Sequence, residues 1–225
     1  MTNMLNSFSY QREANISCLL EDGEYEERKK ALLLLLKAFN DNHIPFAVLC
    51  SFNLFLRGIV DEFHDFDILI DIDNVDAVKG VMESIGATLV ATGGNGFCES
   101  DIYLHYQLDR VDVDIIAGFR VRTYNTELHY AYNPDEIQVC RIYEEKEIDI
   151  PLVSLEALFL LYAMMEGWQA KRRFKRVLIG DCLYRGKIKF PKILERYLNS
   201  HETPSWVKRE IRRIMDWFCS SRGKF

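Results

Sequence analysis

The stretch FAVLCSFNLFLRGIVDEFHDFDILIDID, residues 46–73, decides the fold of this chain. It begins with an apolar run that ends at Cys50 and Ser51, and its second apolar run carries Asp65 and Asp67. Side chains alternate between the two faces of a strand, so residues at i and i+2 point the same way. We therefore expect the two aspartates side by side on one face, with three apolar residues on the other: Phe66, Ile68 and Ile70.

Two neighbouring carboxylates repel each other unless a cation lies between them or one of them is protonated. Mg2+ takes oxygen ligands of this kind and leaves room for phosphate oxygens. The Asp65/Asp67 pair is therefore a candidate metal site. The plain alternative is two solvated charges on an edge strand, and the residues that accompany the pair decide between these interpretations.

A further acidic segment, VDVDII at residues 111–116, follows the pair along the chain. Taken in order, these parts resemble the nucleotidyltransferase superfamily, which includes polymerase-beta-like enzymes and the small antibiotic nucleotidyltransferases. The superfamily pattern is an apolar strand ending in Gly-Ser, then Asp-x-Asp in a second apolar strand, and a third carboxylate on a later strand. Here Cys50-Ser51 stands for Gly-Ser, and Asp65-Phe66-Asp67 supplies the pair. The resemblance covers roughly residues 30 to 120.

The resemblance implies an α/β (α+β) fold, with a small mixed sheet flanked by helices and a helical C-terminal region. We expect a nucleotidyltransferase-like catalytic domain over residues 1–150, whose first 22 residues form a loose arm, and a helical region over 151–225. The implied reaction moves a nucleoside monophosphate from an NTP to a hydroxyl of a small-molecule acceptor and releases pyrophosphate. Mg2+, as two ions, would be the cofactor, held by Asp65, Asp67 and a third carboxylate.

The third carboxylate is either Asp114 or Asp112, which occupy i and i+2 on one strand face. Asp114 leads into two isoleucines and matches the superfamily pattern slightly better, but the sequence leaves both open. Either one would complete the metal site or take the proton of the acceptor as a general base. Two histidines lie nearby: His64, which the alternation places on the face opposite Asp65, and His105, on a strand beside VDVDII.

The resemblance also implies a nucleotide site at Cys50, Ser51 and Arg57, the last within the Leu-Arg-Gly that is typical of the small-molecule branch. Free amides at the start of a short helix near Ser51 would favour a phosphate, and Ser51 itself would donate to a phosphate oxygen or act as an N-cap. A later basic run offers Lys171 as a further phosphate contact, although such a run is commonly a solvated helix face.

Cys50 replaces a glycine whose missing Cβ lets backbone amides approach phosphates closely. This departure keeps a second class of function open: an inactive nucleotidyltransferase fold that serves as a binding module, or an antitoxin-like partner of another protein. A hydrolase that uses the same carboxylates is a weaker third option, because the sequence offers no evident residue to activate water.

Periodicity and capping residues predict the remaining elements. Helices are expected over residues 24–40, 53–56, 75–85 and 155–167 and from Thr203-Pro204 onward, with Ser154 as an N-cap. Strands are expected over residues 46–49, 65–70, 87–92, 102–108, 111–117, 137–143 and 147–150, with a change of structure at Pro151. The segment Gly93-Gly94-Asn95-Gly96 is interpreted as a hairpin turn, not a phosphate loop, because no helix follows it.

Charge is unevenly distributed along the 225 residues, whose net charge is −6. Residues 167–225 hold 16 Lys/Arg against 5 Asp/Glu, and the rest of the chain holds 12 against 29. The basic region therefore faces an anionic ligand or docks against the acidic body. The acidic body argues against a nucleic acid chain as the acceptor. Dispersed cysteines without a C-x-x-C pair, and an N-terminus without an apolar signal segment, indicate a cytoplasmic protein with no membrane partner.

Overall fold

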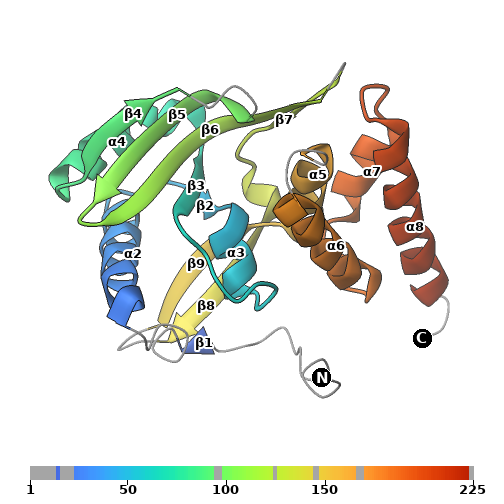
Figure 1. The fold of residues 1–225 in the computed structure, drawn as a ribbon, viewed down its shortest axis with the longest axis horizontal. Helices are drawn as coiled ribbons and strands as arrows, with labels where there is room; N and C mark the ends of the chain where they lie inside the picture. The colour runs from blue at the N-terminus through green and yellow to red at the C-terminus, as the bar shows by residue number, and fades with distance from the viewer. Residues whose placement is uncertain are drawn as a thin grey trace.

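A computed structural model of the chain describes residues 14–15, 23–93, 98–123, 126–143, 147–165 and 170–222. Within these residues the strands form one mixed sheet of nine strands, in the order β1-β8-β9-β2-β3-β6-β5-β4, with β7 paired to β6 (Figure 1). The strands are β1 Ala14–Asn15, β2 Phe46–Val48, β3 Phe66–Ile70, β4 Thr88–Thr92, β5 Cys98–Leu108, β6 Val111–Thr123, β7 Thr126–Tyr130, β8 Ile137–Tyr143 and β9 Glu147–Val153. The α/β prediction is confirmed, and the sheet is larger than the small one expected.

Helices cover both faces of this sheet (Figure 1). Helices α2 (Gly23–Asp41) and α4 (Val75–Ser84) pack on one face. The opposite face is covered by α5 (Leu155–Met164), which is followed by three further helices: α6 Ala170–Tyr184, α7 Pro191–Asn199 and α8 Ser205–Arg222. A short helix, α3 (Cys50–Leu56), joins β2 to the loop before β3. Two 3-10 turns, Ile72–Asn74 and Pro134–Glu136, complete the described elements.

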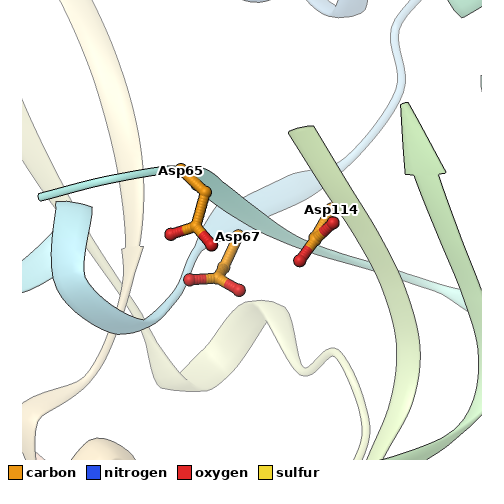
Figure 2. Close-up of side chains that lie close together, drawn as sticks. All are labelled: Asp65, Asp67 and Asp114. Atoms are coloured by element: carbon orange, nitrogen blue, oxygen red, sulfur yellow. The ribbon is translucent and has the colours of Figure 1, made fainter. Parts of the chain in front are cut away.

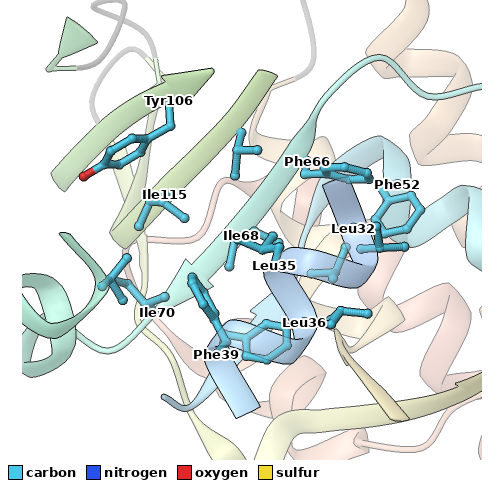
Figure 3. Packing of buried hydrophobic residues seen from close by; sticks show 14 of the residues in the cluster. Leu32, Leu35, Leu36, Phe39, Phe52, Phe66, Ile68, Ile70, Tyr106 and Ile115 are labelled. Atoms are coloured by element: carbon cyan, nitrogen blue, oxygen red, sulfur yellow. The ribbon is translucent and has the colours of Figure 1, made fainter. Parts of the chain in front are cut away.

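The central strands send alternate side chains into two separate cores. Ile68 and Ile70 of β3 pack against α2 and α4, whereas Leu69 between them packs on the side of α5. Figure 3 shows the first core, where leucines of α2 and Phe39 meet β3 and β6. Strands buried on both faces are expected to be continuously apolar, which explains the runs in FAVL and DILI. Asp65 and Asp67 share the face of Leu69, so the carboxylates lie on the α5 side of the sheet.

Helix α3 is fastened to three strands by two polar side chains. Asn53 is fully buried, and its Nδ2 donates to the carbonyl oxygens of Val48 at 2.7 Å and Val153 at 2.9 Å. The Arg57 guanidinium donates to Asn53 Oδ1 at 2.7 Å, Gln138 Oε1 at 2.5 Å and the Val153 carbonyl at 3.0 Å. These bonds fix the helix that follows Cys50 onto β2, β8 and β9.

Several predicted boundaries differ from the structure. Helix α3 begins at Cys50 and not at Asn53, so Leu49 is its N-cap residue and the N-cap role expected for Ser51 is wrong. Pro151 does not mark a change of structure, because β9 continues through it to Val153. Ser154 is confirmed as the N-cap of α5, since its hydroxyl accepts from the Ala157 amide at 3.3 Å.

Other predictions fall partly or wholly outside the described residues. Most of the expected arm, residues 1–22, lies outside them; Ala14–Asn15 pair with β8. Residues 94–96 of the predicted hairpin turn also lie outside. The helix predicted to reach Gly167 ends earlier, because α5 stops at Met164 with Met165 as its C-cap residue. The domain division at residue 150 stays a prediction, and β9 runs across it. Among the described helices, none combines the length and apolar character needed to cross a bilayer.

Candidate active site

Three carboxylates meet where β3 and β6 run side by side. The two strands pair in parallel, and their register sets Asp67 directly beside Asp114. Asp65 immediately precedes β3 and turns the same way, and Figure 2 shows all three carboxylates directed toward one another. Each residue offers a ligand oxygen, and these atoms all lie within 4.8 Å of one another. Oxygen donors at this spacing fit a hard divalent cation such as Mg2+.

Asp112, the alternative third carboxylate, is not part of this cluster. It lies opposite Gln107 of β5, two residues before Asp114, and its side chain is 51% exposed. Of the two residues that the sequence left open, Asp114 lies in the cluster with Asp65 and Asp67, whereas Asp112 lies two residues away along β6 and outside it. A role for Asp114 as the third carboxylate stays a prediction.

The carboxylates destabilise one another's charged forms. Burial raises the pKa of Asp67 well above its usual range, and the negative charges of Asp65 and Asp114 raise it further. The pKa of Asp65 is raised for the same reasons, burial first and then the charge of Asp114. A cation bound among the three would relieve this repulsion. The donor set therefore fits a metal ion electrostatically as well as sterically.

The carboxylates line a cavity of about 620 Å³ between the sheet and helices α5 and α6. One side of the cavity carries Cys50 and Ser51 of α3 together with Lys171, Arg172 and Lys175 of α6. The other side is formed by β4, β5 and β6 and includes Ala91, Ser100, Tyr103, His105 and Phe119. Basic side chains therefore line the same cavity as the acidic cluster, and its volume is within the usual range for small-molecule sites.

Comparisons of structure find three solved structures, of two proteins, with a similar fold. A candidate nucleotidyltransferase from Thermotoga maritima matches at a TM-score of 0.51 with 18% identity, over 68% of this chain and 93% of its own. The antibiotic-resistance factor ANT(2'')-Ia matches at 0.50 with 12% identity, over 87% of this chain and 91% of its own. Its complex with adenylyl-2''-tobramycin matches at 0.50 with 11% identity, over 82% and 97%.

The chain has a nucleotidyltransferase-like fold. This confirms the resemblance drawn from the Ser51, Asp65 and Asp67 pattern. No protein-family model matches the sequence, and no curated protein sequence matches it.

Cys50 occupies the glycine position of the nucleotidyltransferase pattern and adopts a backbone conformation that suits glycine. Its φ is +47°, in the left-handed region where a Cβ is unfavourable. A hydrogen bond from Cys50 to the Asp67 carboxylate opposes the rise in the pKa of Asp67. The cysteine thus places a thiol at the cavity wall. Ser51 beside it is 6% exposed and also lines the cavity.

Lys171 and Lys175 lie one helical turn apart on the face of α6 that borders the cavity. Lys171 Nζ is 3.3 Å from His64 Nε2. Burial lowers the pKa of Lys175, while the nearby Cys50 and Asp67 oppose that effect. Its Nζ also lies 5.8 Å from the ring centroid of Tyr162. From the sequence, the basic run could be either a solvated helix face or a phosphate contact. Three of its residues, Lys171, Arg172 and Lys175, line the cavity.

Two sequence-predicted placements are corrected within the nucleotidyltransferase-like fold. His64 was expected on the face opposite Asp65, but it lines the same cavity because it precedes β3 and strand alternation does not apply there. Arg57 was expected at the nucleotide. It is absent from the described cavity lining, and its guanidinium is engaged by Asn53, Gln138 and the Val153 carbonyl.

Sequence reasoning missed two tyrosines of the cavity and gave Lys175 no specific role. Tyr103 lies two residues before His105 on β5, so strand alternation alone would have placed it beside His105. Burial raises the pKa of Tyr103, and a hydrogen bond to Asp114 adds to the rise. Tyr162 is 5% exposed and, apart from the first-turn Glu156, is the one polar side chain in the apolar helix α5. A lone tyrosine in an otherwise apolar helix was the sequence signal that could have identified Tyr162.

Proposed function

We propose that this protein transfers a nucleoside monophosphate from an NTP to a hydroxyl group of a small-molecule acceptor and releases pyrophosphate. The observation that carries the proposal is the convergence of Asp65, Asp67 and Asp114 within a cavity whose opposite wall is basic. The nucleotidyltransferase-like fold supports it, as does the small-molecule adduct, adenylyl-2''-tobramycin, bound by ANT(2'')-Ia.

In the proposed reaction the acceptor oxygen attacks the α-phosphorus, a new P–O bond forms, and the bond from the α-phosphorus to the pyrophosphate oxygen breaks. Mg2+, as one or two ions held by the three aspartates, would neutralise the charge that develops on the phosphate oxygens. Asp65 and Asp67 would hold the cation that binds the triphosphate. Asp114 takes the proton of the acceptor hydroxyl at a carboxylate oxygen.

Residues outside the acidic cluster are proposed to bind the triphosphate. Lys175 and Lys171 of α6 line the cavity with positive charge, and Ser51 offers a hydroxyl at the start of α3. An ammonium group that burial has partly stripped of water interacts more strongly with a phosphate than a solvated one does. The sheet side, with Tyr103, His105 and Phe119, remains for the acceptor.

The direct test is incubation of the full chain with each α-labelled NTP, Mg2+ and a panel of hydroxylated metabolites and antibiotics. Transfer is expected to yield pyrophosphate and a labelled product in equal amounts, and to stop on chelation with EDTA. Asp67→Asn is the matched control and should give neither product. If neither pyrophosphate nor labelled product forms with any nucleotide and acceptor, while thermal melting shows no shift with any Mg-NTP, the proposal is wrong.

A second candidate, a nucleotide-binding module without transferase activity, is favoured by one observation: a non-glycine residue, Cys50, at φ +47° next to the proposed phosphate site. Its Cβ and thiol occupy space that glycine would leave to a phosphate. The same experiment separates the two functions, because the module would be stabilised by Mg-NTP and would release no pyrophosphate. Gain of activity in Cys50→Gly would identify the thiol as the obstruction.

A further inference from the structure

His105 makes a short side-chain contact to the third carboxylate. It lies directly opposite Asp114 in the antiparallel pair β5/β6, and its Nδ1 is 2.7 Å from Asp114 Oδ1. The two side chains are 26% and 13% exposed. An ionised carboxylate is only an acceptor, so Nδ1 carries the proton and donates it. The other ring nitrogen, Nε2, is 3.6 Å from Asp112 Oδ1, which is too long for a direct hydrogen bond.

We propose that His105 is a positioning residue that fixes the orientation of the Asp114 carboxylate toward the Asp65/Asp67 pair. The role rests on the proposed metal-dependent transfer and adds to it a residue that touches neither the metal nor the nucleotide. Without the Nδ1 contact, the Asp114 carboxylate would lose one of the hydrogen bonds that oppose its rotation away from the pair that repels it. Hydrogen-bond partners that orient ligating carboxylates typically change metal affinity by about 10- to 100-fold when they are removed.

Tyr103 strengthens the same arrangement from the same strand. It stands two residues before His105, so both side chains reach the cavity face of β5, one opposite Ile116 and the other opposite Asp114. The phenol of Tyr103 also forms a hydrogen bond with the Asp114 carboxylate, to which its hydroxyl donates. Asp114 is thereby held from the side of β5, while Asp65 and Asp67 face it from the side of β3.

Asparagine and glutamine at position 105 separate this role from simple space filling. The amide nitrogen of asparagine falls close to the position of histidine Nδ1, whereas that of glutamine falls close to Nε2. His105→Asn therefore keeps the donor that Asp114 needs, although it is the smaller side chain. His105→Gln fills more of the space and directs its amide to the wrong place. A role in packing alone predicts the opposite order of the two variants.

The measurement is Mn2+ affinity of the full-length protein by electron paramagnetic resonance of the free ion, repeated with α,β-methylene-ATP, which cannot transfer its nucleotide. We expect His105→Gln to bind Mn2+ about 10- to 100-fold more weakly than wild type. His105→Asn should stay within about threefold of wild type. Asp112→Asn, which removes the carboxylate facing Nε2 but outside the cluster, should also stay within about threefold. Melting temperatures confirm that each variant is folded.

Each outcome has one meaning. Equal Mn2+ affinity for His105→Gln and wild type would overturn the positioning role while leaving the proposed function intact. So would a loss in folded His105→Asn as large as that in His105→Gln. Failure of wild type itself to bind Mn2+, alone or with the nucleotide analogue, would overturn the metal site of the proposed function and the role of His105 with it.

Discussion

At the scale of single residues, Asp67 bears the greatest electrostatic cost in the candidate site. It is surrounded by Asp65 and Asp114, and burial adds to their repulsion, so its pKa is raised well above 3.8. A group whose folded pKa is raised stabilises the protein fully below its unfolded pKa and loses that contribution as pH rises through the folded pKa. The metal-free protein therefore becomes less stable at this residue as pH increases.

Asp67→Asn is expected to abolish transfer and to raise the stability of the metal-free protein at neutral pH. For each unit by which folding raises the pKa of Asp67, the substitution should raise the free energy of unfolding at neutral pH by about 1.4 kcal/mol. It should vanish below the unfolded pKa near 3.8 and grow as pH rises from there toward neutrality. Urea unfolding in EDTA over this range, for variant and wild type, measures the difference. A destabilised variant would show that the carboxylate is structural.

Cys50 offers a second test at residue scale, because its φ of +47° should make glycine more favourable than alanine at this position. Alanine in a helix is normally about 1 kcal/mol more favourable than glycine. In the left-handed region a Cβ costs about 1–2 kcal/mol. Cys50→Gly should therefore be more stable than Cys50→Ala, although both variants lack the thiol. Chemical denaturation of the two proteins in the same buffer decides the order, and greater stability of Cys50→Ala would contradict the backbone assignment.

At the scale of elements, α3 and α6 supply the two sides of the proposed phosphate site in different ways. Helix α3 is held rigidly to β2, β8 and β9 through Asn53 and Arg57. Helix α6 instead contributes charged side chains that reach into the cavity. Substitutions in the first helix should therefore change the stability of the protein, and substitutions in the second should change its affinity for the nucleotide.

Arg57→Lys should lower the free energy of unfolding by about 1–3 kcal/mol, because a lysine cannot reproduce the planar set of donors and leaves buried acceptors without partners. The dissociation constant for Mg-ATP should change by less than about twofold. Denaturation and calorimetric titration of the same preparation measure the two quantities. A folded and equally stable variant with much weaker Mg-ATP binding would return Arg57 to the nucleotide site.

Lys175→Ala should weaken Mg-ATP binding by about 1.5–3 kcal/mol, the usual range for a hydrogen bond to a charged group. It should cost no stability, because burial already disfavours the charged lysine and lowers its pKa. Arg173→Ala is the matched control, since Arg173 belongs to the same basic run but is exposed and not among the cavity-lining residues. Equal losses of affinity in the two variants would mean that α6 acts only through its overall charge.

At the scale of the whole molecule, charge is segregated along the chain. The 59 residues from 167 to 225 carry 11 more basic than acidic side chains, and the preceding residues carry 17 more acidic than basic ones. Part of the basic segment is accounted for by α6, whose Lys171, Arg172 and Lys175 line the cavity beside the carboxylates. This arrangement concentrates positive charge where a triphosphate would bind and leaves the body of the protein acidic.

The acceptor should therefore be a small molecule and not a nucleic acid chain. Nucleic-acid binding through many phosphate contacts weakens by orders of magnitude between about 50 and 200 mM salt. We expect no submicromolar complex with single- or double-stranded RNA or DNA at the lower concentration, and filter-binding titrations across this range measure it. A tight, salt-sensitive complex coupled to incorporation of nucleotide into the strand would make the protein a polynucleotide transferase.

The sequence by itself determined the features that depend on local order. Alternation within residues 65–70 placed Asp65 and Asp67 on one face of a strand and Phe66, Ile68 and Ile70 on the other. The nucleotidyltransferase resemblance followed from the order of Ser51, the aspartate pair and the VDVDII segment. Short-range periodicity is sufficient for such conclusions because it depends on backbone geometry alone.

Only the tertiary structure decided which distant residues meet. Asp112 and Asp114 are equivalent by alternation, and the register of β6 against β3 selected Asp114. The antiparallel pairing of β5 with β6 brought His105 to Asp114. The position of α6 beside the sheet brought Lys175 to the cavity. Arg57 is absent from the described cavity lining, and β8 and β9, which are remote from it in sequence, supply acceptors for its guanidinium. Apart from the pairing of β5 with β6, which a two-residue turn connects, these contacts join segments far apart in the chain, and no local pattern encodes how such segments meet.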